Sequence, residues 1–309
     1  MLSTRPFECP PALLARAQRN PAVTTAVANA GAVLALESAK QATEARLITP
    51  ILVGNREGIA RTADEIGWEI GAFEILHADD EDMAALKAAK LAGDGHAAAL
   101  MKGHVHTDAF MMAILNRDSG LRTGRRLTHV FHMTVPDHDK ALLITDAAVN
   151  IAPDLETKFE AIRNAVDLAQ NLGTAKPRVA ILSGTEEATV RMPSSMDAAA
   201  LTERAATELQ NAQVFGPLAF DNAVSRDAAL MKSIDLPVAG IADILLVPNI
   251  ETGNALFKMM VYFMSACAAG IVLGAKVPAI LTSRADPPEA RLASAAIAAI
   301  LAGAEKDAV

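Results

Sequence analysis

Apolar residues in this chain occur in short continuous runs, typical of buried strands, and in longer stretches with the period of about 3.6 residues that is typical of helices. The first stretch, Leu13 to Ala45, is rich in alanine and is predicted to be helical with a break at Pro21. Strands and helices are then predicted in turn at 50–54, 58–66, 74–77, 81–91, 97–101 and 107–116. This alternation predicts parallel strands joined by crossover helices.

The pattern restarts after Arg126. Strands are predicted at 127–133, 141–145, 178–183, 215–218, 244–247 and 277–281, and helices at 155–172, 197–210, 253–270 and 292–302. No repeat and no long Gly/Ser linker separates the two halves of the chain, so they are expected to meet directly. The fold class predicted from these patterns is α/β.

Composition narrows the class of protein. The 309 residues suit two domains of about 150 residues or one large α/β domain. Hydrophobic residues make up 51% and aromatic residues only 4%, so the core is expected to consist of alanine and aliphatic side chains. The net charge of −8 argues against a nucleic-acid partner, which needs a basic face, but allows a small anion held by a few local arginines.

The chain is expected to be cytoplasmic and not to be a membrane protein. Cys9 and Cys267 are far apart and show no pairing pattern, which fits a reducing compartment. The N-terminus lacks the apolar region of a signal peptide. The most apolar stretch, 259–275, is shorter than the roughly 20 residues of a membrane span and contains Ser265, so a buried helix is favoured there.

Polar residues directly after predicted strands are the first candidates for a site, because open α/β sheets bind ligands at the carboxyl ends of their strands. Four segments meet this condition. They are Lys102-Gly103, Gly184-Thr185, the stretch Asn249 to Asn254, and Ser283-Arg284.

The segment from Thr282 to Asp286 carries the strongest chemistry. Ser283 offers a hydroxyl, and Arg284 offers a planar cation that matches a phosphate group. Asp286 and Glu289 are possible bases. For Asp286, which precedes Pro287-Pro288, capping of the last helix is an equally good interpretation.

Two further segments are candidates for substrate binding. Asn249, Gly253, Asn254 and Lys258 follow the strand 244–247, and the last two share one helix face; helix capping with a solvated lysine is the alternative. Arg122 belongs to a basic cluster that has two possible interpretations: it binds phosphate, or it forms a solvated turn between domains. The histidines lack matching carboxylate or cysteine spacing, so no metal site is predicted. A P-loop and a dinucleotide fingerprint are also missing.

Several of these motifs resemble the phosphate acetyltransferase and phosphate butyryltransferase family. The most specific matches lie between 240 and 286, and they include Pro248-Asn249-Ile250-Glu251-Thr252-Gly253-Asn254, Lys258, 269–278, and Leu281-Thr282-Ser283-Arg284-Ala285-Asp286. Weaker matches are 52–54, 101–103, 120–124 and 216–221.

The resemblance implies two α/β domains with an interdomain cleft, in a fold like that of isocitrate and isopropylmalate dehydrogenases. Domain I would comprise residues 1–125 and 273–309, and domain II residues 126–272. The family typically forms homodimers, so a homodimer is expected.

The reaction implied is acyl-CoA plus phosphate giving acyl phosphate plus CoA, by direct attack of phosphate on the thioester. Arg284 would hold phosphate and Ser283 would donate to the developing negative charge. Acyl-CoA and inorganic phosphate are the expected partners, coenzyme A is substrate or product, and no separate cofactor, metal or covalent acyl-enzyme is required.

One departure from the family affects the expected chemistry. Acetyl-specific members have a carboxylate seven residues after the motif serine, where this chain has Ala290, so the base is either Asp286 or Glu289. Acetyl-CoA is the favoured substrate. The Pro248-to-Glu251 loop is nearer to that of the butyryl-type members, so butyryl-CoA is the alternative substrate. A non-catalytic CoA-binding protein on the same fold is the alternative function.

Overall fold

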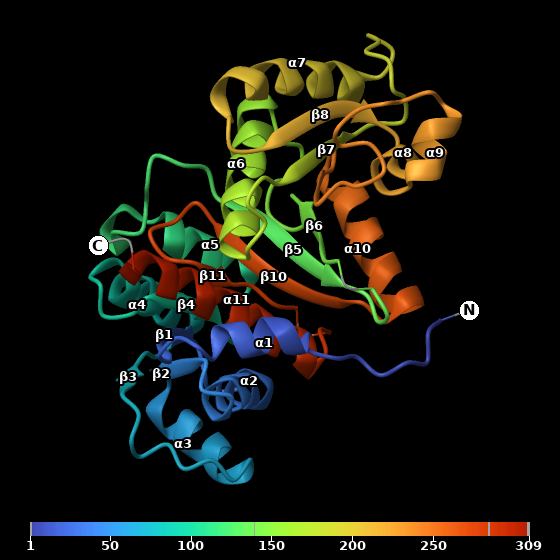
Figure 1. Ribbon diagram of the computed structural model, residues 1–309. Coiled ribbons are helices and arrows are strands. Elements are labelled where there is room, and N and C mark those ends of the chain that lie inside the picture. Colours follow the sequence, from blue (N-terminus) through green and yellow to red (C-terminus); the bar gives the residue numbers. More distant parts are fainter. Residues whose placement is uncertain (1, 139, 284, 308–309) are drawn as a thin grey trace. The chain divides into compact units, whose positions relative to one another are not determined.

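A computed structural model describes residues 2–138, 140–283 and 285–307 of the chain (Figure 1). The chain forms two compact units. Unit 1 consists of Met1–Pro6 and Arg126–Ala268, and unit 2 consists of Phe7–Arg125 and Ala269–Val309. Strand β10 (Cys267–Leu273) carries the chain from unit 1 back into unit 2.

Unit 2 contains a mostly parallel sheet in the order β3-β2-β1-β4-β11-β10. Its strands are β1 (Val23–Ala28), β2 (Ile48–Gly54), β3 (Ile75–His77), β4 (Ala99–Lys102) and β11 (Ala279–Ile280), followed by β10 at the end of that order. Strand β11 lies parallel to β4, with Ile280 opposite Met101, and antiparallel to β10. The register brings the carboxyl ends of β4 and β11 to one edge of the sheet.

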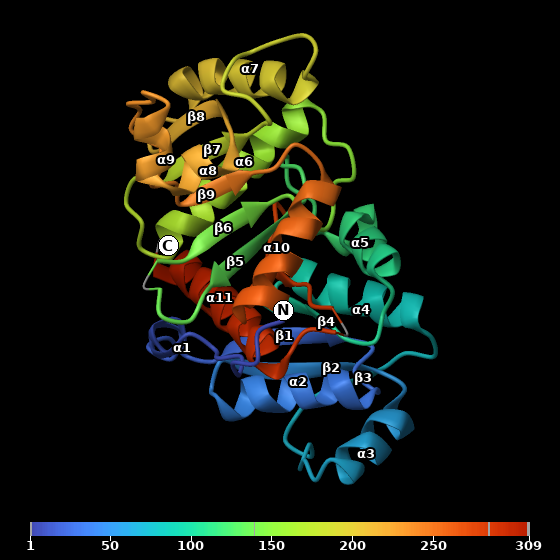
Figure 2. The same cartoon turned by 90° about the vertical axis from the view of Figure 1, so that its right-hand side faces the viewer.

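Helices cover both faces of this sheet. Helices α2 (Val33–Glu44) and α3 (Arg56–Glu65) connect strands that advance in one direction, and α4 (Glu81–Gly93) connects strands that step back. Right-handed crossovers therefore place α4 on the face opposite α2 and α3. Helix α11 (Pro288–Asp307) packs against α2 and against α1 (Pro11–Ala17), and α5 (Thr107–Leu115) packs on α4 (Figure 2). The short helix η1 (Arg117–Ser119) follows α5.

Unit 1 contains the strands β5-β6-β9-β7-β8 in that order. Their bounds are Thr128–Thr134, Leu142–Thr145, Ile244–Leu246, Arg178–Leu182 and Gln213–Leu218. Strands β5 and β6 are antiparallel and the remaining neighbours are parallel. The helices are α6 (Leu155–Asn171), α7 (Pro193–Glu208), α8 (Phe220–Val224), α9 (Arg226–Met231) and α10 (Ile250–Met264).

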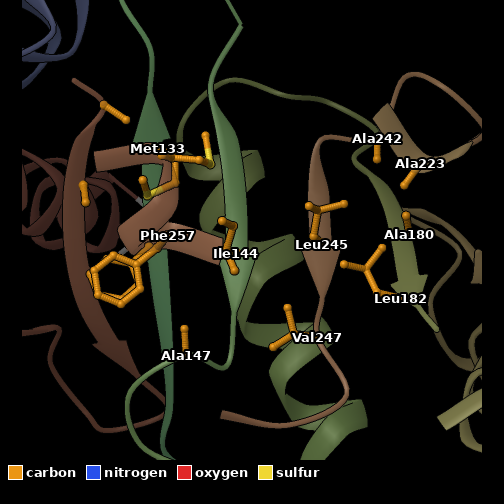
Figure 3. Close-up of a cluster of buried hydrophobic side chains, with 14 of the residues drawn as sticks. Met133, Ile144, Ala147, Ala180, Leu182, Ala223, Ala242, Leu245, Val247 and Phe257 are labelled. Carbon is orange, nitrogen blue, oxygen red and sulfur yellow. The ribbon is translucent and has the colours of Figure 1, made fainter. Parts of the chain in front are cut away.

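The core of unit 1 follows the period of two along its strands. Alternate residues such as Leu245 and Val247 belong to one buried apolar cluster that also includes Phe257 of α10 (Figure 3). The rings of Phe131 and Phe257 stack with centroids 4.0 Å apart. Because successive strand side chains point to opposite faces, the residue between them, Leu246, faces the other way. This apolar layer fixes α10, and with it the loop at its start.

Two predicted helices contain a strand that the sequence patterns did not reveal. The segment predicted as helical from Leu13 to Ala45 contains β1 at Val23–Ala28. The predicted helix 253–270 is also wrong at its end, because α10 stops at Met264, Ser265 takes a positive φ of 50°, and β10 begins at Cys267. Short alanine-containing apolar runs have no period of their own, so they were assigned to the neighbouring helix.

The predicted α/β class is confirmed, and parallel pairing is confirmed for β1 to β4 and β11. The pairs β5–β6 and β10–β11 are antiparallel instead. Each of these two pairs is joined by a short connection, too short for the crossover helix that parallel neighbours need. Among the described residues, no helix is long and apolar enough to cross a bilayer.

Candidate functional site

A small cavity of about 30 Å³ lies within unit 2 at the carboxyl ends of β4 and β11. Its walls come from the first turns of α2, from the segments that follow the two strands, and from α11. The lining residues are Leu34, Ala35, Ser38, Lys102, Gly103, His104, Thr282, Ser283 and Arg291. Sites for drug-sized ligands take about 300–1,000 Å³, so this cavity suits a small polar group and not a nucleotide. We call it the β4–β11 pocket.

Three predicted substrate-site residues, Lys102, Thr282 and Ser283, line this pocket together. The pairing of β4 with β11 explains the convergence. Ile280 lies opposite Met101, so the residues that follow each strand leave the sheet side by side. The rule that placed the candidates at strand ends also brings them to one edge.

Gly103 holds the β4 side of the pocket close to the sheet. A Cβ atom built at this position would lie 2.3 Å from the carbonyl oxygen of Ala28 and 2.8 Å from that of Asn29. The Gly103 amide donates to the Ala28 oxygen at 2.9 Å, and the Asn29 side-chain amide donates to the His104 oxygen at 2.7 Å. Only glycine fits between these backbones, which fixes the position of Lys102 beside it.

The loop on the β11 side closes on itself through Asp286. The Ser283 amide donates to Asp286 Oδ2 at 2.6 Å, the Asp286 amide donates to the Ser283 oxygen at 3.1 Å, and the Ala285 amide donates to Ser283 Oγ at 3.3 Å. Ser283 itself is exposed. The Asp286 carboxylate therefore shapes the loop that presents the Ser283 hydroxyl. Arg284, the predicted phosphate ligand of this loop, lies outside the described residues.

Arg291 in the second turn of α11 is the buried cation of the pocket, at 7% exposure. Its Nη1 donates to the backbone oxygen of Asp286, and its Nε has no hydrogen-bond partner among the described residues. Burial lowers the pKa of the Arg291 guanidinium, and the carboxylates of Asp286, Glu37 and Glu289 oppose that shift. A guanidinium stays charged at neutral pH even so.

Glu289 lies in the first turn of α11 and is not among the residues that line the β4–β11 pocket. Its charge acts on the nearby Cys9, where burial first and Glu289 second raise the pKa of the thiol to about 11. Arg122, a predicted substrate ligand, is exposed, and its backbone forms a single antiparallel β-bridge with Ala275. It does not line the β4–β11 pocket.

Comparison with known proteins identifies the family of the chain. Residues 78–299 match the sequence family described as phosphate acetyl/butaryl transferase. A phosphate acetyltransferase of Rhizobium meliloti is 46% identical over 291 residues, which cover 94% of this chain and 92% of that protein. A phosphate butyryltransferase of Clostridium beijerinckii is 40% identical over 295 residues, which cover 95% and 98%.

The chain belongs to the phosphate acetyl/butaryl transferase family. The resemblance noted from its motifs is thereby confirmed. Among solved structures, a branched-chain phosphotransacylase from Enterococcus faecalis V583 is similar with a TM-score of 0.80 at 33% identity, over 91% of this chain and 99% of that one. The family match includes both strand ends of the β4–β11 pocket and most of α11.

The residues of unit 1 that were predicted to bind substrate lie at the start of α10. Asn249 is the N-cap, and its Oδ1 accepts from the Thr252 amide at 3.0 Å and from Thr252 Oγ1 at 2.6 Å. A Cβ atom at Gly253 would lie 2.6 Å from the Ala147 Cβ, so the close approach that glycine permits here is to the neighbouring chain segment. Both residues thus have a structural role of their own.

Asn254 and Lys258 follow one turn apart on α10, as their spacing predicted. Lys258 is exposed, with its Nζ 6.0 Å from the centre of the Phe257 ring, and Asn254 is half-buried. Both side chains are available to a ligand on the surface of unit 1.

Sequence reasoning missed three polar members of the pocket, Ser38, His104 and Arg291. Ser38 lies inside α2, where its Oγ donates to the Leu34 oxygen at 2.6 Å, and nothing in its sequence context points to a ligand. Arg291 does carry a detectable pattern. It is the only charged residue from 290 to 304, in a helix that is otherwise alanine and aliphatic and therefore buried. A single arginine on such a helix has to meet a polar surface.

Proposed function

We propose that the protein is a phosphate acyltransferase that converts acyl-CoA and inorganic phosphate into acyl phosphate and CoA. A phosphate oxygen attacks the thioester carbonyl carbon, the carbon–sulfur bond breaks, and the CoA thiolate leaves and takes up a proton. Acetyl-CoA is the favoured donor and butyryl-CoA is the alternative. The convergence of Lys102, Thr282 and Ser283 in one small polar pocket is the observation that supports this function best.

The chemistry requires that phosphate be held next to the carbonyl and that negative charge be stabilised as it develops. Arg284 is the proposed phosphate ligand from the motif, and the Ser283 hydroxyl is the proposed donor to the developing charge. Lys102 and Thr282 complete the binding of phosphate from the other strand end and from the loop. Loss of one such donor costs about 100- to 1,000-fold in kcat in other enzymes, and a similar loss is expected for Ser283→Ala.

The base that accepts the phosphate proton is proposed to be Asp286 or Glu289. The bond between the Ser283 amide and Asp286 Oδ2 supports a shaping role for Asp286, since loss of that carboxylate would release the loop. Asp286→Asn can keep an acceptor oxygen for this bond while removing a base. The base is Asp286 if this variant loses kcat at an unchanged KM for phosphate; a loss confined to Glu289→Gln assigns the role to Glu289.

Arg122, Asn249, Gly253, Asn254 and Lys258 are proposed to bind the acyl-CoA substrate. The cationic side chains of Arg122 and Lys258 and the amides of Asn249 and Asn254 suit the phosphates of CoA, and Gly253 gives the backbone room at the start of α10. We further propose two α/β domains with the bounds expected from the sequence, 1–125 with 273–309 and 126–272. An isocitrate dehydrogenase-like arrangement with an interdomain cleft, a homodimer and a cytoplasmic location also remain proposals.

Turnover across a series of acyl chain lengths tests the function. The purified protein is mixed with acetyl-, butyryl- or a branched acyl-CoA, and free thiol is measured before and after addition of phosphate. Phosphate-dependent thiol release is expected, and the preferred donor fixes the acyl length. Tight CoA binding with no thiol release from any donor would contradict the proposal and favour a non-catalytic CoA-binding protein.

A further inference from the structure

The geometry of the β4–β11 pocket points to Arg291 as a phosphate ligand of this enzyme, a role that none of the family motifs discussed above assigns. This inference rests on the proposed function and adds one residue to it. Arg291 comes from α11 and not from a loop after a strand. The pocket would thus hold phosphate between a helix-borne guanidinium and the strand-end groups Lys102 and Ser283.

The burial of Arg291 is the first observation that supports this role. The residue is 7% exposed, and Ala290, Ala293 and Ser294, which are near it along α11, are at most 1% exposed. Removing a guanidinium from water costs several kcal/mol unless the charge is paired. In the described part of the chain, no carboxylate forms an ion pair with it, and its one hydrogen bond goes to the Asp286 carbonyl. The donor capacity that remains matches an anionic ligand.

The direction of the side chain is the second observation. Side chains on an α-helix tilt toward the helix N-terminus, so Arg291 projects back over the turn that starts at Pro288. The bond from Nη1 to the Asp286 oxygen confirms this direction, because Asp286 precedes the helix. The same bond ties the guanidinium to the loop that presents Ser283. The N-terminus of α11 adds a favourable field for an anion at this place.

Nearby carboxylates act on Arg291 at longer range and do not replace a ligand. Glu37, Asp286 and Glu289 each favour its charged form, yet the pKa of the guanidinium still lies below its usual range because burial outweighs them. Asp286 Oδ2 accepts from the Ser283 amide. A doubly or singly charged phosphate in the pocket would supply the missing counter-charge at contact distance.

The test compares Arg291→Met with Arg291→Lys in steady-state thiol release. Methionine keeps an unbranched apolar stem at this buried position and removes the guanidinium with its charge and donors. We expect Arg291→Met to raise the KM for phosphate about tenfold to a hundredfold, because it removes one charge-assisted hydrogen-bonding group. The KM for acyl-CoA should stay within about twofold. Arg291→Lys is expected to recover part of the phosphate affinity, since it restores the charge without the planar fork.

Arg56→Met is the matched control. Arg56 lies in the same unit, and its Nη2 also donates to a backbone oxygen, that of Ile75, but it does not line the pocket. Its phosphate KM should not change. An unchanged phosphate KM in a folded, active Arg291→Met enzyme would overturn the inference while leaving the proposed function intact. If wild-type protein releases no thiol from any acyl-CoA, the proposed function fails instead. Phosphate binding is then measured as the rise in melting temperature that inorganic phosphate causes. An equal rise in wild type and in Arg291→Met would overturn the role of Arg291 in that case too.

Discussion

Two arginines, one in each unit, show two ways in which this protein handles a cation inside its structure. Arg178 in unit 1 donates to Asp243 from Nε at 2.8 Å, from Nη2 at 2.9 Å and from its backbone amide at 2.8 Å. Lys140 adds a second cation at 2.9 Å from the same carboxylate. Arg291 in unit 2 is buried with one hydrogen bond to a carbonyl and no ion pair among the described residues.

The difference separates a structural cation from one kept for a ligand. Asp243 and Arg178 satisfy each other, and burial raises the pKa of Asp243 less than the hydrogen bonds from Arg178 and Lys140 lower it. The pair therefore stabilises the fold as it stands. Arg291 costs stability in the free protein, and such a cost is typical of sites that are arranged for binding or catalysis.

The largest effect is expected from breaking the satisfied pair. Asp243→Ala leaves Arg178 and Lys140 without their carboxylate. We expect the free energy of unfolding to fall by about 3–4 kcal/mol. This lies in the lower half of the range for buried pairs because the Arg178 side chain is 31% exposed. Urea unfolding of wild type and variant measures this. A loss below about 1 kcal/mol would mean that the pair is not structural.

A buried histidine extends the comparison to a group that avoids the cost of burial by losing its charge. His132 on β5 is 8% exposed, and burial lowers its pKa from 6.5 to about 4. Between these values the unfolded chain binds a proton that the folded protein does not, so stability falls as pH decreases from about 6.5 to 4, by about 3 kcal/mol in total at 1.36 kcal/mol per pKa unit.

The matched variant for that prediction is His132→Leu, which fills the same buried position without a titrating group. Its unfolding free energy should depend less on pH than that of wild type, and the two curves should differ by about 3 kcal/mol more at pH 4 than at pH 7. Parallel curves would show that His132 titrates normally.

The smallest change in stability is expected for Arg291→Met. The variant loses one hydrogen bond to Asp286, which is worth about 1 kcal/mol, and it also relieves the burial of an unpaired charge. The two terms oppose each other, so the unfolding free energy should stay within about 1 kcal/mol of wild type. A loss comparable to that of Asp243→Ala would identify Arg291 as a second structural cation and remove the contrast.

The sequence predicts the fold best where strands have clear boundaries. Strand β2 ends at Gly54 and β4 is followed by Gly103, and both strands were predicted within a few residues. Strands β1 and β10 were missed because they are short and adjoin helical segments that also contain alanine, although four of the six residues of β1 are β-branched and favour a strand.

The site was predicted to the extent that it depends on strand ends. Lys102, Thr282 and Ser283 line one pocket because β4 and β11 are parallel neighbours, although the pairing itself was not visible in the sequence. Arg291 was missed because it lies in a helix, where a charged residue is ordinarily solvated. Its isolation on an apolar helix was a signal of burial, but a single sequence does not reveal that α11 packs against α1 and α2.

Calorimetric titration of inorganic phosphate into wild type and Arg291→Met, without acyl-CoA, tests the central claim most directly. Wild type should bind phosphate saturably, and Arg291→Met should bind at least about tenfold more weakly, which corresponds to 1.4 kcal/mol of binding free energy. Arg178→Met should keep the wild-type affinity in its folded form. Equal phosphate affinity of wild type and a folded Arg291→Met would contradict the account.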